Sequence, residues 1–204
     1  MHILLASHGS FIEEPKTALK ESIEKIDKQV LENSSISGGS TALCALIRGE
    51  KLYVANVGDS KAVLVSNGEV RDLTRQHRAS NEDEKMLIES RGGVVIDRKN
   101  TSLVQGSLQL SRSIGDRKYK QYITCEPDIV EHEIAKDDQM VIMATDGFWD
   151  VMSSQDVKEL IQNRENETSG LSKMLVEAAI EKKKYGLDNI SLVAIHLQEL
   201  MKSE

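Results

Sequence analysis

Apolar positions along the chain follow two kinds of spacing, one helical and one typical of strands. After Pro15, a stripe spaced i, i+4, i+7 and i+11 marks one face of an amphipathic helix: Leu19, Ile23, Ile26 and Val30. Similar spacing predicts helices over residues 80–91, 154–163 and 169–184. A Ser/Asn cap is expected to begin the first of these three helices, and a pair of glycines to end it.

Shorter apolar runs predict strands at residues 41–47, 52–57 and 62–65, and their short connections favour an antiparallel meander. An Asn67-Gly68 pair after the third run indicates a two-residue hairpin turn. Further strand candidates lie at residues 94–96, 109–110, 129–134, 140–144 and 190–197. Because strands and helices fall in separate blocks, the pattern predicts an α+β fold rather than a parallel α/β fold.

The composition is that of an ordinary globular domain. The 204 residues are 39% hydrophobic and 29% charged, which excludes a disordered chain, and their number fits one domain. The net charge of −7 leaves no basic stripe for a phosphate backbone, so no nucleic-acid partner is expected. No apolar run approaches the ~18 residues of a membrane span, and the start lacks a signal peptide's basic segment, so no membrane partner is expected.

Two cysteines, Cys44 and Cys125, are too few for a disulfide framework. Reduced thiols are typical of the cytoplasm and the nucleus, which are the expected locations. Neither cysteine is followed by an arginine six residues later, so the loop of a thiolate-based phosphatase is absent from the sequence.

Three aspartates share one setting, the end of a strand that is expected to be buried. Asp59 and Asp146 each follow an apolar run, Asp188 precedes one, and Asp150 lies four residues beyond Asp146. Any one of them alone fits an ordinary turn or cap, but several at strand ends favour a cluster. Clustered carboxylates repel one another and need a cation, and oxygen ligands favour Mg²⁺ or Mn²⁺. The spacing therefore indicates metal-assisted hydrolysis or phosphoryl chemistry.

Six motifs then occur in one order along the chain: Ser-Gly-Gly-Ser-Thr-Ala (37–42), Val-Ala-Asn-Val-Gly-Asp-Ser-Lys-Ala-Val (54–63), Gly-Ser-Leu-Gln-Leu-Ser-Arg-Ser-Ile-Gly-Asp (106–116), Glu-Pro-Asp-Ile (126–129), Ala-Thr-Asp-Gly-Phe-Trp-Asp-Val (144–151) and Asp-Asn-Ile-Ser (188–191). With these motifs the chain resembles the metal-dependent protein phosphatase (PPM) family, the type 2C serine/threonine phosphatases. The resemblance covers about residues 14–197 of one partial domain, residues 1–204.

This resemblance implies an α-β-β-α sandwich, two antiparallel sheets flanked by helices, with a binuclear Mn²⁺ or Mg²⁺ centre. By motif match, Asp146 and Asp188 are direct metal ligands, and Asp59 and Asp150 belong to a weaker third-metal position. The implied reaction is hydrolysis of phosphoserine or phosphothreonine in phosphoprotein substrates by metal-activated water, with no side chain singled out as the catalytic group.

The family's first metal-binding half, which precedes the Gly-Gly-Ser-Thr motif, has no match here. It comprises an arginine for the substrate phosphate, a Glu-Asp pair and Asp-Gly-His-Gly-Gly, whereas residues 6–9 read Ala-Ser-His-Gly. The domain is therefore expected to be N-terminally incomplete. Two alternatives follow: a phosphatase domain, or a catalytically inactive pseudophosphatase that acts as a binding or regulatory protein.

Some side chains in or near the motifs are given structural roles. Trp149 is expected to pack beside the metal loop, and Arg112 to support the fold rather than bind phosphate. Five methionines are expected to fill the core: Met86, Met140, Met143, Met152 and Met174.

Overall fold

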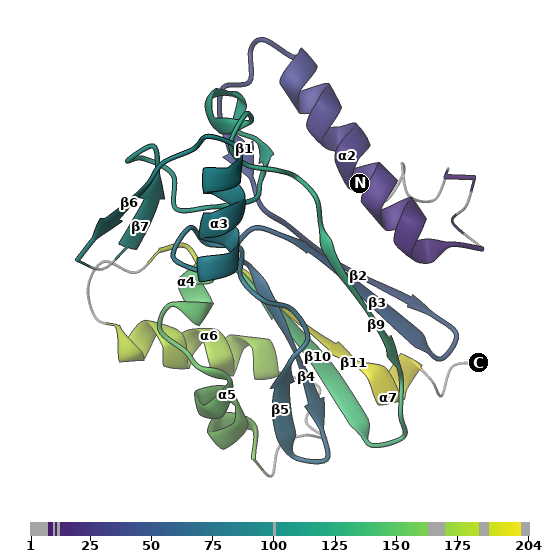
Figure 1. Ribbon diagram of the computed structural model, residues 1–204. Helices are drawn as coiled ribbons and strands as arrows, with labels where there is room; N and C mark the ends of the chain where they lie inside the picture. The colour runs from purple at the N-terminus through teal and green to yellow at the C-terminus, as the bar shows by residue number, and fades with distance from the viewer. Residues whose placement is uncertain are drawn as a thin grey trace. The chain divides into compact units, whose positions relative to one another are not determined.

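The computed structural model describes residues 8–9, 11, 13–99, 101–162, 170–183 and 188–200 (Figure 1). The chain divides into two compact units, and each is described by itself. The first unit comprises Met1–Cys44, Ala55–Asp59 and Gln76–Ile129, and the second comprises Ala45–Val54, Ser60–Arg75 and Val130–Glu204. Among the described residues, no helix combines the length and the apolar character that a membrane span needs.

In the first unit, a long helix packs against a short two-stranded sheet. Helix α2 (Pro15–Glu32) begins with a proline, whose fixed φ suits the first helical turn, and it contacts β8 (Ile114–Gly115). Strand β8 pairs antiparallel with β1 (Gly39–Ser40). The backbone amide of Gly115 also donates to the buried carboxylate of Asp27 on α2 at 2.7 Å, which fixes the helix to this sheet.

The same unit contains a helix and a hairpin that share a small core. Helix α3 (Glu82–Ser90) contacts β6 (Val95–Arg98), which pairs antiparallel with β7 (Thr101–Val104). A short 3₁₀ turn, η1 (Arg117–Tyr119), lies further along the chain. The buried apolar residues of this part form one cluster: Ala79, Ile88, Val104 and Ile123.

The second unit is built on a four-stranded antiparallel sheet with the strand order β11-β10-β4-β5. Its strands are β4 (Lys61–Ser66), β5 (Glu69–Asp72), β10 (Asp138–Ala144) and β11 (Leu192–His196). Strand β10 is central, and Ile142 on it lies opposite Val63 of β4 and Ala194 of β11. The Asn67-Gly68 turn joins β4 to β5, and both residues have the positive φ that such a hairpin requires, 51° and 72°.

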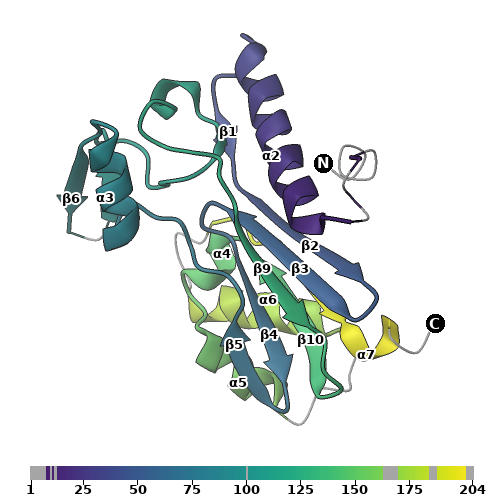
Figure 2. The ribbon, with the colours of Figure 1, turned by 45° about the vertical axis from the view of Figure 1, so that its right-hand side comes forward.

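Helices cover one face of this sheet (Figure 2). These helices are α4 (Asp146–Trp149), α5 (Ser154–Ile161) and α6 (Leu171–Lys182). A further short helix, α7 (Leu197–Leu200), directly follows β11. Because side chains alternate along a strand, Val63, Val65 and Ile142 lie on one face, where they pack with the helices. Leu64 and Val141 point the opposite way and are also fully buried, so both faces of the sheet are covered.

A third sheet has the strand order β2-β3-β9. Its strands are β2 (Ala42–Arg48), β3 (Lys51–Val57) and β9 (Asp128–Glu133), and the division between the two units falls within all three. Mixed helices and antiparallel sheets confirm the predicted α+β class.

Most of the predicted helices and strands are confirmed, although residues 163, 169 and 184, at the predicted helix ends, lie outside the described residues. The predicted meander is wrong, because β4 pairs with β10 and β5 while β2 and β3 belong to another sheet. A break between β3 and β4 accounts for this: Gly58 has a φ of 104°, and a Cβ there would lie 2.4 Å from Thr41 Cγ2. A local reading of the sequence cannot see the distant partner β10.

Two smaller expectations about α3 are also wrong. Asn81 occupies the N-cap position, but its side chain makes no cap hydrogen bond and donates instead to the Gln76 carbonyl at 2.6 Å. Met86 is 63% exposed, since the buried side of this helix carries Glu84 and Ile88. Met140 and Met152 are buried as expected.

Candidate functional site

The two strand ends that carry predicted ligands lie side by side in the second unit. Ala144 of β10 is opposite Leu192 of β11, and the pairing continues beyond both strands. The Thr145 amide donates to the Ser191 carbonyl at 3.0 Å, and the Ser191 amide donates to Thr145 Oγ1 at 3.1 Å. These bonds hold the loop after β10 against the loop before β11.

Asp146 and Asp188 are therefore brought together. A Cβ on Gly147 would lie 2.3 Å from the Asn189 carbonyl oxygen and 3.3 Å from the carbonyl carbon of Asp188, so the two backbones touch. Only a glycine permits this approach. Each carboxylate accepts a hydrogen bond from the amide that follows it: Asp146 from Gly147 at 2.9 Å, and Asp188 from Asn189 at 2.7 Å.

Helix α4 anchors Asp146 through its apolar residues. Phe148 is fully buried, and its ring meets Trp149 edge-to-face at 4.9 Å. Trp149 Nε1 donates to the Lys61 carbonyl at 2.9 Å, and Lys61 Nζ lies 4.3 Å from the centre of the indole ring. The expected packing role of Trp149 is therefore confirmed. Asp150 ends the helix in an exposed position, and its amide donates to the Asp146 carbonyl at 2.7 Å.

This end of the sheet offers oxygen donors to a cation. Asp146 and Asp188 supply carboxylates, the ligand type that Mg²⁺ and Mn²⁺ prefer, and no His or Cys is needed in such a site. Within the described ranges, no group of three or more His, Cys, Asp and Glu side chains gathers around one point. The residues thus fit a divalent ion as a pair of ligands rather than as a complete shell.

Asp59 belongs to the first unit and is tied into it. Its side chain is buried, Oδ2 lies 3.2 Å from Arg78 Nη2, and its carbonyl accepts from Gln76 Nε2 at 2.6 Å. The preceding Gly58 amide donates to Nδ1 of buried His77 at 3.1 Å. A cation bound by Asp59 would have to share this carboxylate with the Arg78 guanidinium.

A buried ionic network, which sequence reasoning did not identify, lies behind that loop in the first unit. Arg112 pairs with Glu84 at 2.5 Å and with Asp128 at 2.7 Å, and Asp128 in turn lies 3.1 Å from His77 Nε2. Ser111 donates to Glu84 at 2.6 Å. Arg112 is thus enclosed by carboxylates, which confirms its structural role.

The pKa values in this network follow from burial and pairing. Burial alone would raise the pKa of Glu84, but the hydrogen bonds from Arg112 and Ser111 outweigh it and hold the pKa below its ordinary value. Burial, together with the nearby positive charge of Arg112, lowers the pKa of His77. A neutral His77 imidazole and an ionised Glu84 carboxylate are therefore the states that this network favours at neutral pH.

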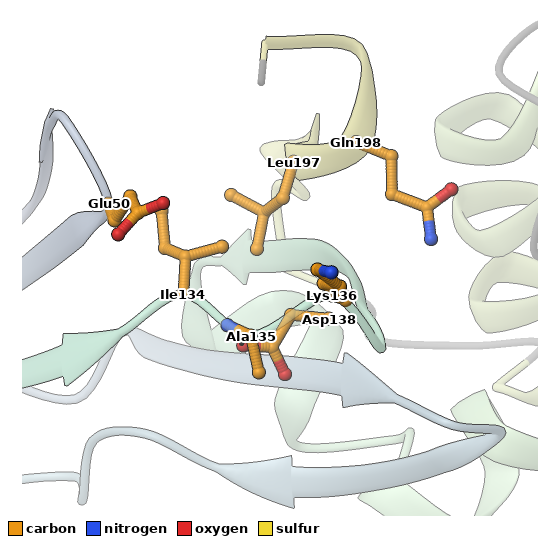
Figure 3. Close-up of a pocket in the computed structure, with 7 residues that line it drawn as sticks. All are labelled: Glu50, Ile134, Ala135, Lys136, Asp138, Leu197 and Gln198. Atoms are coloured by element: carbon orange, nitrogen blue, oxygen red, sulfur yellow. Dashed lines mark hydrogen bonds between the residues drawn. The ribbon is translucent and has the colours of Figure 1, made fainter. Parts of the chain in front are cut away.

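The opposite ends of β10 and β11 border a cavity of about 370 Å³ (Figure 3). Ile134 and Leu197 are buried beside it, and Glu50, Lys136 and Gln198 also line it. The lining residue Asp138 is only 2% exposed, and its Oδ2 accepts from His132 Nε2 at 2.6 Å and from the Ala135 amide at 2.8 Å. Through these two hydrogen bonds, the Asp138 carboxylate stabilises the connection between β9 and β10.

With the fold and the acidic strand ends described, the class of protein can be stated. Residues 1–186 match the family model described as Protein phosphatase 2C, and the chain belongs to this family.

Named relatives agree with that family. The chain is 36% identical to "Probable protein phosphatase 2C 52" of Oryza sativa subsp. japonica, over 95% of this chain and 39% of that protein. It is 36% identical to "Probable protein phosphatase 2C 69" of Arabidopsis thaliana, over 96% of this chain and 55% of that protein. The chain thus spans about half the length of these two curated relatives, 39% of one and 55% of the other.

Solved structures resemble the chain over nearly all of its length. One is described as a "C.elegans sex determining protein", with a TM-score of 0.86 and 30% identity over 98% of this chain and 52% of that one. Another is a serine-threonine phosphatase 2C from Toxoplasma gondii, with a TM-score of 0.83 and 21% identity over 95% of this chain and 77% of that one. The latter likeness concerns the fold alone.

Proposed function

We propose that this protein hydrolyses phosphoserine and phosphothreonine in protein substrates with the help of a divalent cation. The observation that carries the proposal is the contact between the Asp146–Gly147 and Asp188–Asn189 backbones, which places two carboxylate-bearing residues side by side. Membership of the protein phosphatase 2C family supports the same reaction class.

In this proposal Asp146 and Asp188 hold the cation, Mn²⁺ or Mg²⁺. A bound divalent cation lowers the pKa of water and neutralises phosphoryl oxygens. The chain's own contribution is positioning: Phe148 and Trp149 fix α4 in the core, and the Gly147–Asn189 contact sets the separation of the two loops. Asp150 and Asp59 are the candidates for a weaker, additional cation position.

The partners proposed are phosphoproteins, and the proposed location is the cytoplasm, the nucleus or both. Free thiols at Cys44 and Cys125 support a reducing compartment. Burial, followed by the negative charge of Asp27, raises the pKa of the Cys125 thiol to about 11, so this thiol stays protonated and is a poor nucleophile.

The test is phosphate release from a phosphothreonine peptide by the 204-residue chain. Turnover is expected with Mn²⁺, to vanish with excess EDTA and to return when Mn²⁺ is restored. Asp188→Asn should lower turnover at least about 100-fold. The matched control is Asp137→Asn, an exposed aspartate in the turn before β10, which should retain full activity.

An absence of Mn²⁺-dependent turnover in the folded chain would overturn the proposal and favour the binding-protein alternative. Turnover that survives Asp188→Asn would show that the acidic pair has been assigned wrongly.

A further inference from the structure

The cavity at the ends of β10 and β11 that lie away from Asp146 and Asp188 has no part in the proposed phosphatase chemistry (Figure 3). Its volume of about 370 Å³ falls in the usual range for small-molecule sites, about 300–1,000 Å³. All of its lining residues belong to the second unit, so the site lies within a single unit.

Two buried aliphatic side chains form the apolar part of the lining. Ile134 is 9% exposed and Leu197 is 1% exposed, and Figure 3 shows the two side chains pointing toward one another. Leu197 begins α7, which contacts β10, so this side of the cavity is fixed to the central strand of the sheet. A branched hydrocarbon group placed beside these two residues would exchange water for an apolar surface.

A buried carboxylate holds the neighbouring wall of the cavity in place. Asp138 Oδ2 accepts hydrogen bonds from His132 Nε2 at 2.6 Å and from the Ala135 amide at 2.8 Å, so its charge is already engaged within the fold. The same bonds fix the connection that supplies Ile134, Ala135 and Lys136 to the lining. Because this wall is formed before any ligand arrives, binding pays little ordering entropy.

Two oppositely charged side chains at the cavity have no ionic partner among the described residues. Glu50 and Lys136 are both exposed, and neither forms an ion pair with the other or with another described side chain. The Ile134 amide donates to the Glu50 carbonyl at 2.7 Å, which places Glu50 beside the segment that carries Lys136. A cationic ligand would pair with Glu50 alone and an anionic ligand with Lys136 alone, whereas a zwitterion pairs with both.

We propose that this cavity binds a free aliphatic α-amino acid of about the size of leucine. The ammonium group of the ligand pairs with Glu50, its carboxylate pairs with Lys136, and its side chain packs against Ile134 and Leu197. Because both charged side chains are exposed, each ion pair adds little, and most of the affinity comes from burying the aliphatic group. Binding requires neither a metal nor turnover, so this inference does not depend on the proposed activity.

The test is a titration of the isotope-labelled 204-residue chain with L-leucine, followed by NMR in EDTA at constant ionic strength. The amide signals of Ala135 and Lys136 and the methyl signals of Leu197 are expected to shift and saturate. Three analogues separate the contributions of the ligand. Glycine lacks the aliphatic group and should bind at least about tenfold more weakly than leucine. The analogue without the ammonium group, 4-methylpentanoate, and the analogue without the carboxylate, 3-methylbutylamine, should each bind roughly two- to fivefold more weakly.

Two variants place the ligand in this cavity. Ala135 is exposed and lines the cavity, so the ring in Ala135→Trp should fill the site without removing a core side chain, and leucine binding should be lost. Ser35→Trp, at an exposed turn after α2, is the control and should bind leucine like the wild type. Lys136→Gln should remove the advantage of leucine over 3-methylbutylamine, whereas Lys183→Gln, at an exposed position outside the lining, should keep it.

Three results would overturn the proposal. One is the absence of a saturable shift with leucine, and another is unchanged leucine binding in Ala135→Trp, whose amide signals outside residues 130–140 and 196–198 show whether it is folded. The third is equal affinity for leucine and either singly charged analogue, because the site would then not recognise a zwitterion. Because the assay contains EDTA, none of these results bears on the role of Asp146 and Asp188.

Discussion

Strand β10 has an aspartate at each end, and the fold uses the two in opposite ways. Asp138 is buried and accepts hydrogen bonds from His132 and from the Ala135 amide. Asp146, eight residues further along the chain and just past the end of β10, is placed beside a second acidic residue, Asp188. The first carboxylate is hydrogen-bonded to a histidine and to a backbone amide, whereas the second lies in a loop that contacts another loop with an acidic residue.

The difference teaches how to tell a structural aspartate from a functional one. Both residues lie at the end of a buried strand, so position alone does not separate them. What separates them is the surroundings: a histidine and a backbone amide stabilise the carboxylate at one end, while the loop beside the other end carries a second acidic residue, Asp188. The stability of the fold should therefore depend on Asp138, and activity on Asp146.

The largest expected effect is on activity at the acidic end. Asp146→Asn should reduce Mn²⁺-dependent turnover of a phosphothreonine peptide at least about 100-fold, because a ligand charge is removed. The free energy of unfolding without metal should change little, because an asparagine oxygen can still accept the hydrogen bond from the Gly147 amide. Steady-state kinetics and urea unfolding of the same preparation check both parts. If Asp146→Asn unfolded more easily and kept its turnover, Asp146 would be a structural residue, as proposed for Asp138, and the contrast between the two aspartates would be wrong.

The buried end should show the opposite behaviour. Asp138→Ala removes the partner of His132 and of the Ala135 amide, so the free energy of unfolding should fall by about 2 kcal/mol. Turnover per folded molecule should be unchanged. Urea unfolding measures the loss, and Asp137→Ala, an exposed neighbour, should cost almost nothing.

The pH dependence of stability sharpens the same contrast. Burial alone would raise the pKa of Asp138, but hydrogen bonds from His132 and the Ala135 amide outweigh it and hold the pKa below its ordinary value. Because the folded-state pKa is depressed, this contribution is fully present above about pH 4 and is lost as the pH falls through the folded value.

Urea unfolding from pH 7 to pH 3 should therefore show a steeper loss of stability in the wild type than in Asp138→Asn. Parallel curves for the two proteins would mean that Asp138 is not preferentially ionised in the fold.

The smallest expected effect is on stability and concerns Trp149, which anchors helix α4 next to Asp146. Trp149→Phe removes the hydrogen bond to the Lys61 carbonyl and weakens the stacking of Lys61, so the free energy of unfolding should fall by about 1 kcal/mol. The matched comparison is Trp149→Leu, which removes the hydrogen bond and the aromatic ring together and should cost more than Trp149→Phe. Thermal unfolding of both variants measures the two losses; a loss in Trp149→Phe close to zero would mean that the bond to the Lys61 carbonyl does not stabilise this end.

Much of this fold could be predicted because its local signals are strong. The stripe of α2 and the Asn67-Gly68 turn each reflect a periodicity or a backbone requirement contained in a few neighbouring residues. The pairing of β4 with β10 could not be predicted in this way, because no local pattern specifies which distant strand a buried strand will join.

The residues of the candidate site also differ in whether a local sequence pattern indicates them. Asp146 and Asp188 were found from their position at the ends of apolar runs, and the bonds between Thr145 and Ser191 bring those ends together. The partners of ion pairs carry no such signal. Arg112 and Glu84 are 28 residues apart, and nothing in either segment indicates that one will neutralise the other.

The central claim, that the acidic end of β10 binds a divalent cation, is tested most directly by titrating Mn²⁺ and following the free ion by electron paramagnetic resonance. The wild-type chain and Asp137→Asn should bind Mn²⁺ equally well, and the double variant Asp146→Asn/Asp188→Asn should bind it at least about tenfold more weakly. Unchanged affinity in the folded double variant would contradict the account, because Mn²⁺ would then be held by residues other than this pair.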